Sequence, residues 1–258
     1  MIDSHCHIYS DKYDHDVDDV IGRARERLSG IVVSAVDMES LEKSLAIRRR
    51  HPGFIYVSAG IHPGTTADLG DEARRQFWQA IGRVRNEIVA LGEVGPDYHH
   101  VRDPRKRRKQ LGVLEEALSY AEQWELPLVI HARRAEADAL KVVSCSRIPV
   151  MFHCFAGPTQ TARVIATRGF YISFSALLLG DTGLQETAKA IPPERILTET
   201  DSPALSPRPD APRNEPAFVE TIVACLAKLL DCPPEKSAEI TAANARRFFG
   251  LPNLLNDS

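Results

Sequence analysis

Short apolar runs alternate with amphipathic stretches from one end of the chain to the other. Several runs are rich in Val and Ile and apolar throughout, which is typical of β-strands covered on both faces. We therefore predict eight strands. They lie at Met1–Ile2, Ile31–Val36, Phe54–Ile61, Ile88–Leu91, Leu126–Ile130, Ile148–Phe152, Phe170–Phe174 and Ile196–Leu197.

Apolar residues at helical spacing occupy the stretches between the runs. The helices that this spacing predicts lie near residues 17–28, 77–84, 104–121, 215–230 and 234–249. Because strand and helix alternate, the strands should be parallel and joined by right-handed crossovers. Eight such units predict an α/β fold, a (β/α)8 TIM barrel, with residues 1–258 as a single domain. A doubly wound open sheet is second choice, since no glycine-rich phosphate loop follows the first strand.

Composition and charge exclude only a few classes of protein. The 258 residues are 43% hydrophobic and 26% charged, as in ordinary globular proteins. A net charge of −3 argues against coating nucleic acid by charge alone but leaves room for a local basic cleft. Without an apolar leader or a run of about 18 apolar residues, we expect no membrane association. Five scattered cysteines predict reduced thiols in a cytoplasmic protein, and nothing indicates an obligate protein partner.

Histidines and carboxylates stand at the C-terminal ends of the apolar runs, and in a barrel all these ends point to the face that carries active sites. Neutral imidazoles and carboxylates suit Zn²⁺, Mn²⁺ or related ions, and two adjacent ions need a bridging ligand. A lone H-x-H would be a weak signal, but several such residues on one face predict a metal site. The candidate ligands are His5, His7, Glu93, His131, His153 and Asp201.

Roles within this set follow from spacing and residue type. His5 and His7 lie two apart on an extended strand end, so both can reach one ion. Glu93 can bridge two ions, and Asp201 can bind one ion and hold the attacking water. Glu199, two residues before Asp201, is a further catalytic candidate that orients a water or a ligand histidine.

The same residues lie in segments that resemble a known family. D-S-H-C-H at Asp3–His7 resembles the D-x-H-x-H opening of the amidohydrolase superfamily, and the remaining segments resemble its TatD-type deoxyribonuclease family. They occur in the family order over nearly the whole chain. These segments are GIHPG (Gly60–Gly64), GEVGPDYH (Gly92–His99), VIHARRA (Val129–Ala135), FHCFAG (Phe152–Gly157), ETDSPAL (Glu199–Leu205) and RNEP (Arg213–Pro216).

The resemblance implies a (β/α)8 barrel whose one or two divalent metal ions serve phosphodiester hydrolysis, usually of DNA and often from a 3′ end. It places the ligands on the six residues named above, with Glu93 in the bridging position that a carbamylated lysine fills in many relatives. Substrate phosphate contacts would fall on His62, Arg133 and Arg213. The family often has leucine where Pro96 stands and tyrosine where Ala204 stands, which affects the substrate more than the metal site.

The hypothesis is therefore a metal-dependent deoxyribonuclease that uses Zn, Mn or Mg and takes DNA or another nucleic acid as substrate. Hydrolysis of a different ester is the alternative, as in D-aminoacyl-tRNA deacylases, lactonases and phosphotriesterases. A non-enzymatic binding module is a third, but it predicts a broken ligand set. The basic run Arg102–Gln110 is either a guide for DNA or, as we expect, a solvated helix start.

Overall fold

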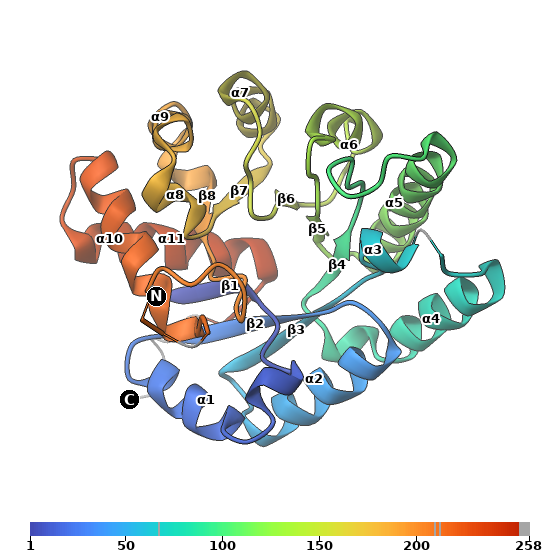
Figure 1. Ribbon diagram of the computed structural model, residues 1–258, viewed down its shortest axis with the longest axis horizontal. Helices are drawn as coiled ribbons and strands as arrows, with labels where there is room; N and C mark the ends of the chain where they lie inside the picture. Colours follow the sequence, from blue (N-terminus) through green and yellow to red (C-terminus); the bar gives the residue numbers. More distant parts are fainter. Residues whose placement is uncertain (67, 209, 212, 253–258) are drawn as a thin grey trace.

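Eight parallel strands form a single sheet in the computed structural model, which describes residues 1–66, 68–208, 210–211 and 213–252 (Figure 1). Each strand pairs with the next along the chain, in the order β1 to β8. This arrangement confirms the predicted (β/α)8 barrel and excludes the doubly wound sheet, whose strand order reverses. The strands are β1 Ile2–Cys6, β2 Gly30–Ala35, β3 Ile55–Ala59, β4 Ala90–Val94, β5 Leu128–Ile130, β6 Val150–Phe152, β7 Tyr171–Phe174 and β8 Ile196–Thr198.

Helices surround the strands on the outside (Figure 1). The α-helices are α1 Val17–Arg25, α2 Met38–Arg50, α3 Pro63–Thr66, α4 Asp71–Arg83, α5 Pro104–Trp124, α6 Glu136–Val142, α7 Thr159–Thr167, α8 Leu177–Gly180, α9 Thr182–Lys189, α10 Val219–Leu229 and α11 Pro234–Phe249. Short 3-10 helices lie at η1 Asp11–Tyr13, η2 Arg85–Glu87, η3 Pro193–Arg195 and η4 Pro216–Phe218. Helix α5 begins where predicted, with Pro104 in its first turn and the Asp103 carboxylate capping it.

The barrel closes between its first and last strands through hydrogen bonds near the C-terminal ends. The Asp201 amide donates to the His5 carbonyl at 3.0 Å, and the His7 amide donates to the Ser202 carbonyl at 2.7 Å. One step deeper, the Ser4 hydroxyl donates to the Thr198 carbonyl at 2.9 Å. The segments that carry His5, His7 and Asp201 are therefore joined by the backbone itself.

The opposite end of the barrel is apolar. One residue on most strands contributes to a buried cluster, and helix α11 covers that cluster with Ala242, Ala245, Phe248 and Phe249. The Asn244 amide in the same helix donates to the carbonyls of Pro193 and Ile196, both at 2.8 Å. The strand residues are Ile2, Val32, Ala90, Val129, Met151, Tyr171 and Leu197. A packed apolar cluster at the N-terminal ends of the strands thus lies beneath the polar residues at their C-terminal ends.

Two strands extend three or four residues beyond the C-terminal ends of the apolar runs that predicted them. Strand β1 continues from Ile2 to Cys6, so His5 lies inside the strand, and β4 continues to Val94, so Glu93 does as well. The pairing register shifts between Asp3 and Cys6 and again between Leu91 and Val94. Such irregularities re-aim side chains. The prediction that Glu93 and His5 follow their strands was therefore wrong by a few residues.

The proline-rich segment 202–216 follows β8 as predicted and runs beside the barrel mouth, drawn in orange in Figure 1. Residues 209, 212 and 253–258, which belong to this loop and to the predicted domain 1–258, lie outside the described residues. None of the helices in the described part of the chain is both long and apolar enough to cross a membrane.

Candidate metal centre

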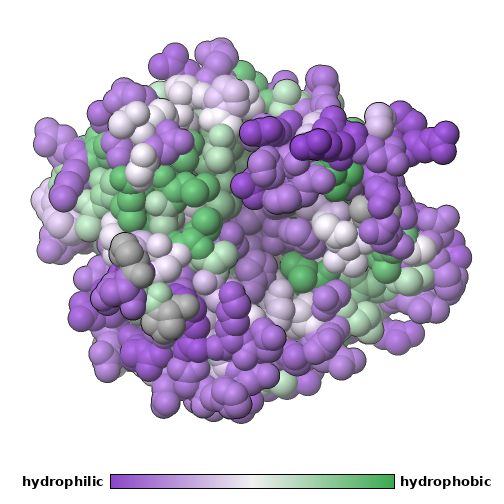
Figure 2. All heavy atoms as spheres, viewed as in Figure 1, coloured by the Kyte–Doolittle hydropathy of each residue, from purple (hydrophilic) through white to green (hydrophobic). Residues whose placement is uncertain are grey.

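A cavity of about 500 Å³ opens at the C-terminal ends of the strands. Figure 2 shows hydrophilic residues in the hollowed centre of the molecule. All six predicted ligands lie in or directly beneath this cavity. His7, Glu93, His131, His153 and Asp201 line it, and the fully buried His5 contacts Glu93 from below. The structure therefore brings the predicted residues together on one face.

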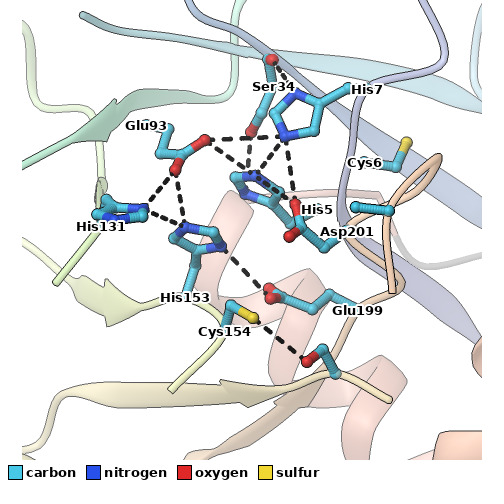
Figure 3. Close-up of polar contacts among 12 residues, drawn as sticks. His5, Cys6, His7, Ser34, Glu93, His131, His153, Cys154, Glu199 and Asp201 are labelled. Carbon is cyan, nitrogen blue, oxygen red and sulfur yellow. Dashed lines mark hydrogen bonds and ion pairs between the residues drawn. The ribbon is translucent and has the colours of Figure 1, made fainter. Parts of the chain in front are cut away.

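His5 and His7 converge on a single point (Figure 3). Their Nε2 atoms are 3.2 Å apart. The Nδ1 of His7 lies 2.9 Å from the Ser34 carbonyl oxygen, and the Nδ1 of His5 lies 3.1 Å from the Ser34 hydroxyl. Because the His7 Nδ1–H donates to that carbonyl, its Nε2 presents a lone pair toward His5. Two nitrogen donors that approach so closely are arranged for a cation between them.

Glu93 lies between two groups of imidazoles. Its Oε2 is 3.3 Å from the Nε2 of His5 and 3.8 Å from that of His7. Its Oε1 is 2.7 Å from the Nδ1 of His131 and 2.9 Å from the Nε2 of His153. Each oxygen of one buried carboxylate thus faces a different pair of histidines, which is the geometry of a bridging ligand.

Asp201 completes the group around His5 and His7. Its Oδ1 is 3.3 Å from the Nε2 of His7 and 3.8 Å from that of His5. The residue follows β8 in the left-handed region, at φ +53°, and its side chain lines the cavity. Three overlapping sets of ligand atoms, each lying within 4.8 Å of one another, could hold an ion; they are His5–Glu93–His153, His5–His7–Asp201 and His62–Glu93–His131.

The outer nitrogens of the second histidine pair lie next to carboxylates, His131 in a hydrogen bond and His153 in an ion-pair contact without hydrogen-bond geometry. The Nε2 of His131 is 3.2 Å from Asp97 Oδ2, and the Nδ1 of His153 is 3.4 Å from Glu199 Oε1. Glu199 is fully buried and accepts a hydrogen bond from the Ser173 hydroxyl at 2.5 Å. Carboxylates in this position fix the orientation of ligand histidines. Glu199 therefore contacts His153, the ligand-orienting alternative of the two roles that its spacing predicted.

The charges in the cluster favour ionised carboxylates. Burial tends to raise the pKa of Glu93, but the imidazoles of His153 and His62 hold it well below its usual range. Burial likewise opposes ionisation of Asp201, yet the hydrogen bond from His7 lowers the pKa of its carboxyl. Burial lowers the pKa of His5, which favours the neutral form that binds metals. Although burial lowers the pKa of His7, His131 and His153, the neighbouring carboxylates raise it, so a cation that binds there would displace protons. The imidazole and carboxylate donors are of the types that bind divalent cations.

Two glycines make room around Glu93. Gly92 and Gly95 have φ angles of +113° and +143°, which side chains other than hydrogen rarely allow. A Cβ at Gly92 would collide with the Val129 carbonyl oxygen, and one at Gly95 would collide with that of His131. These close approaches of β4 to β5 explain why the G-E-V-G segment needs both glycines.

The three predicted substrate contacts differ in their surroundings. His62 and Arg133 line the cavity, and the Nε2 of His62 is 3.5 Å from Glu93 Oε1. Arg213 does not line it. Its guanidinium donates to Asp16 at 2.5 Å and to the Lys12 carbonyl, and it stacks 4.4 Å from the centre of the Tyr13 ring. The geometry therefore gives no support to a substrate contact by Arg213, because the residue lies outside the cavity lining and its terminal nitrogens are engaged by these partners.

The basic run 102–110 forms the start of α5, and several of its cations are engaged within the protein. Lys106 pairs with Asp68 at 2.6 Å, and Lys109 donates to the Leu69 carbonyl at 2.5 Å. Arg107 donates to two backbone carbonyls and stacks on the Tyr98 ring. These contacts agree with the expected helix start.

Two residues that sequence reasoning did not include belong to the site. Asp97 contacts both His131 and the Nδ1 of His100, the latter at 2.8 Å. Ser34 holds both His5 and His7, as described above. Asp97 is four residues after Glu93 in the matched segment, so its position could have indicated it. Ser34 stands inside the apolar run 31–36, where a serine carries no such signal.

Comparisons with known proteins agree with this geometry. The chain is 32% identical over 258 residues to an "Uncharacterized metal-dependent hydrolase YabD" of Bacillus subtilis, covering 97% of this chain and 99% of that protein. It is also 32% identical to a "3'-5' ssDNA/RNA exonuclease TatD" of Cronobacter sakazakii, over 96% and 97% of the two chains. The crystal structure of the TatD homologue YJJV from Escherichia coli superposes with a TM-score of 0.89 at 25% identity, over 98% of both chains.

The barrel, the ligand cluster and these relatives define a metal-dependent hydrolase. The model of the family described as TatD related DNase matches residues 2–250. The chain belongs to the TatD family.

Proposed function

We propose that this protein hydrolyses phosphodiester bonds of single-stranded nucleic acid, DNA in the first place, from the 3′ end. One or two divalent metal ions, Zn²⁺, Mn²⁺ or Mg²⁺, would be held by His5, His7, Glu93, His131, His153 and Asp201. The observation that carries the proposal is the position of Glu93, whose two oxygens face two separate groups of ligands. Histidine-rich ligation favours Zn²⁺ or Mn²⁺ over Mg²⁺.

When bound, such ions lower the pKa of water and stabilise negative charge on phosphate oxygens. The residues of the chain supply the remaining functions. Asp201 is ionised and borders the cavity, so it can accept a proton from the attacking water. Arg133 and His62 border the same cavity and bind the phosphate, the guanidinium in a bidentate manner. Glu199 keeps the His153 ring in place through its Nδ1.

The choice of substrate rests on the mouth of the cavity and on one relative. Basic groups at the rim suit a polyanion better than an uncharged lactone. The Cronobacter relative is named for activity on ssDNA and RNA, whereas the Bacillus relative is named only as a hydrolase. D-aminoacyl-tRNA and lactones remain the alternative substrates, and the same metal centre would serve them.

Hydrolysis of a 3′-labelled single-stranded oligonucleotide in Mn²⁺ or Mg²⁺ tests the proposal. Glu93→Gln and Asp201→Asn preserve size but remove one ligand charge, so each should lower kcat/KM at least 100-fold. Arg27→Gln, in an exposed ion pair with Glu220, is the matched control and should retain the wild-type rate. Wild-type rates in both site variants would overturn the proposal. Turnover of D-aminoacyl-tRNA or a lactone without nuclease activity would favour the alternative.

A further inference from the structure

The mouth of the cavity is divided into two chemically different halves. The loops after β3, β4 and β5 contribute His62, His100 and Arg133. The loops after β6, β7 and β8 contribute apolar residues, including Ala156, Leu177 and Leu205. Because neighbouring strands are consecutive in the barrel, these groups occupy two facing arcs around the ligands. We call the second group, Ala156, Leu177, Ala204 and Leu205, the apolar arc.

The side chains of the apolar arc remain open to solvent. Leu177, the first residue of α8, is 38% exposed and is one of two large hydrophobic residues classed as exposed in the described part of the chain. Ala156 and Ala204 are exposed, and Leu205 is half-buried. Figure 2 shows apolar residues over α8, next to the hollowed centre. A single exposed leucine is ordinary, but several apolar residues on one wall of a cavity indicate a ligand surface.

The loop that carries Leu205 is rigidly built. The buried Asn214 amide donates to the carbonyls of Thr200, Ala204 and Leu205 at 2.8, 2.7 and 3.1 Å. The Tyr13 hydroxyl in turn donates to the Asn214 carbonyl at 2.6 Å. Leu205 lies at φ +54°, a backbone conformation that such a network must hold in place. Ala204 and Leu205, two of the four residues of the apolar arc, are thus fixed relative to Asp201, which lies in the same loop.

We propose that the apolar arc binds the base of the terminal nucleotide while the phosphate lies toward Arg133 and His62. This inference rests on the proposed nuclease function and names the subsite that would hold its substrate. A nucleotide has a charged end and a flat base with apolar faces, which matches a cavity with Arg133 and His62 on one wall, beside the carboxylates of Glu93 and Asp97, and apolar side chains on the other. A volume of about 500 Å³ suits a ligand of this size.

The apolar arc would pack against the base without distinguishing one base from another. Ala156, Leu177, Ala204 and Leu205 have no side-chain donor or acceptor, so hydrogen bonds from them cannot distinguish bases. Packing on the faces of a base is tolerant of sequence because every base has such a face. The subsite therefore recognises the presence of a base rather than its identity.

Removal of the terminal nucleotide from two oligonucleotides tests the inference. One carries an ordinary 3′-terminal nucleotide, and the other carries an abasic one with the same phosphates. Wild-type protein with Mn²⁺ should prefer the first in kcat/KM on the order of fivefold, from the apolar contact with the base. Leu177→Ser and Leu205→Ser should each reduce that preference toward one. Met38→Ser, at the other exposed large hydrophobic side chain and outside the cavity lining, should keep it.

Three results would overturn the inference. Wild-type protein that removes both terminal nucleotides equally well has no base subsite. Unchanged preference in both arc variants, with melting temperatures near wild type, places the base elsewhere while leaving the nuclease function intact. Wild-type protein that cleaves neither oligonucleotide overturns the proposed function itself, and this inference with it.

Discussion

Each histidine in the metal centre has its second ring nitrogen next to a polar oxygen. Ser34 serves His5 and His7, Asp97 serves His131, and Glu199 serves His153. These outer contacts select the tautomer and orient the ring, so that the other nitrogen points toward Glu93 or Asp201. The outer residues come from three different strands or the loops after them: Ser34 from β2, Asp97 from the loop after β4 and Glu199 from the loop after β8.

Ser34→Ala should weaken metal binding by about 10- to 100-fold, because it removes the hydroxyl beside His5 Nδ1. The backbone carbonyl that holds His7 remains, so binding is weakened but not lost. Competition with a chromophoric chelator measures the affinity. Ser44→Ala is the matched control, since the Ser44 hydroxyl is buried without a hydrogen-bond partner. Equal affinities in Ser34→Ala and wild type would contradict the role of this hydroxyl.

Asp97→Asn should also weaken metal binding, in this case by changing the contact with His131. The carboxylate is mostly buried, and although burial tends to raise its pKa, the hydrogen bonds from His131 and His100 hold it well below its usual range. An amide cannot stabilise the His131 Nε2–H as strongly, so metal affinity should fall by about 10-fold or more. Chelator competition measures this change. The neighbouring His99→Asn, on an exposed side chain, should leave affinity unchanged, and a similar loss there would rule out a specific effect of Asp97.

At the scale of elements, the strand positions were predictable and their exact ends were not. Apolar runs marked all eight strands because the outer faces of the barrel pack against helices. The predicted strands ended at Ile2 in β1 and at Leu91 in β4, because the residues that follow include polar side chains that lie inside the barrel mouth. At the C-terminal ends of these two strands, polar residues such as His5 and Glu93 interrupt the apolar pattern. Side-chain partners such as Ser34 depend on contacts across strands, which no local pattern encodes.

Gly95→Ala should destabilise the fold by about 2–4 kcal/mol, because alanine there has both an unfavourable φ angle and a collision with the His131 carbonyl oxygen. Gly112→Ala is the matched control. That glycine lies within α5 with nothing near its absent Cβ, so the change should stabilise by about 0.5–1 kcal/mol. Urea unfolding measures both. A Gly95→Ala protein as stable as wild type would refute the close approach of β4 to β5.

At the scale of the molecule, the segment after β8 connects the metal centre to the outer helices. Asn214 fastens its first part, and Arg213 ties it to η1 and α1 through Tyr13 and Asp16. Glu215 continues the link by accepting two hydrogen bonds from Arg23, at 3.0 and 2.8 Å. The family resemblance placed a phosphate contact at Arg213 in the RNEP segment. In the structure, Arg213 instead ties this segment to residues 12–16, which are distant in sequence.

Arg213→Ala should therefore lower stability more than activity, and Arg133→Ala should lower activity more than stability. The first should lower stability by about 1–2 kcal/mol, because a partly buried ion pair and ring stacking are lost. The second should lower kcat/KM on single-stranded DNA about tenfold or more, through loss of a charged hydrogen bond to phosphate, with little change in melting temperature. Thermal unfolding and nuclease rates on both variants distinguish them. The reverse pattern would restore Arg213 to the substrate site.

The two facing arcs of the mouth have a consequence for how such a protein can change. The ligands stand within three residues of strand ends, and Asp201 shares the loop after β8 with Ala204 and Leu205, whereas Ala156 and Leu177 stand on the segments after β6 and β7. Under the proposed function, exchanging Ala156 or Leu177 would therefore alter substrate preference without removing a metal ligand. The proposed base subsite can thus change while the residues of the proposed metal centre are kept, because the two use different side chains.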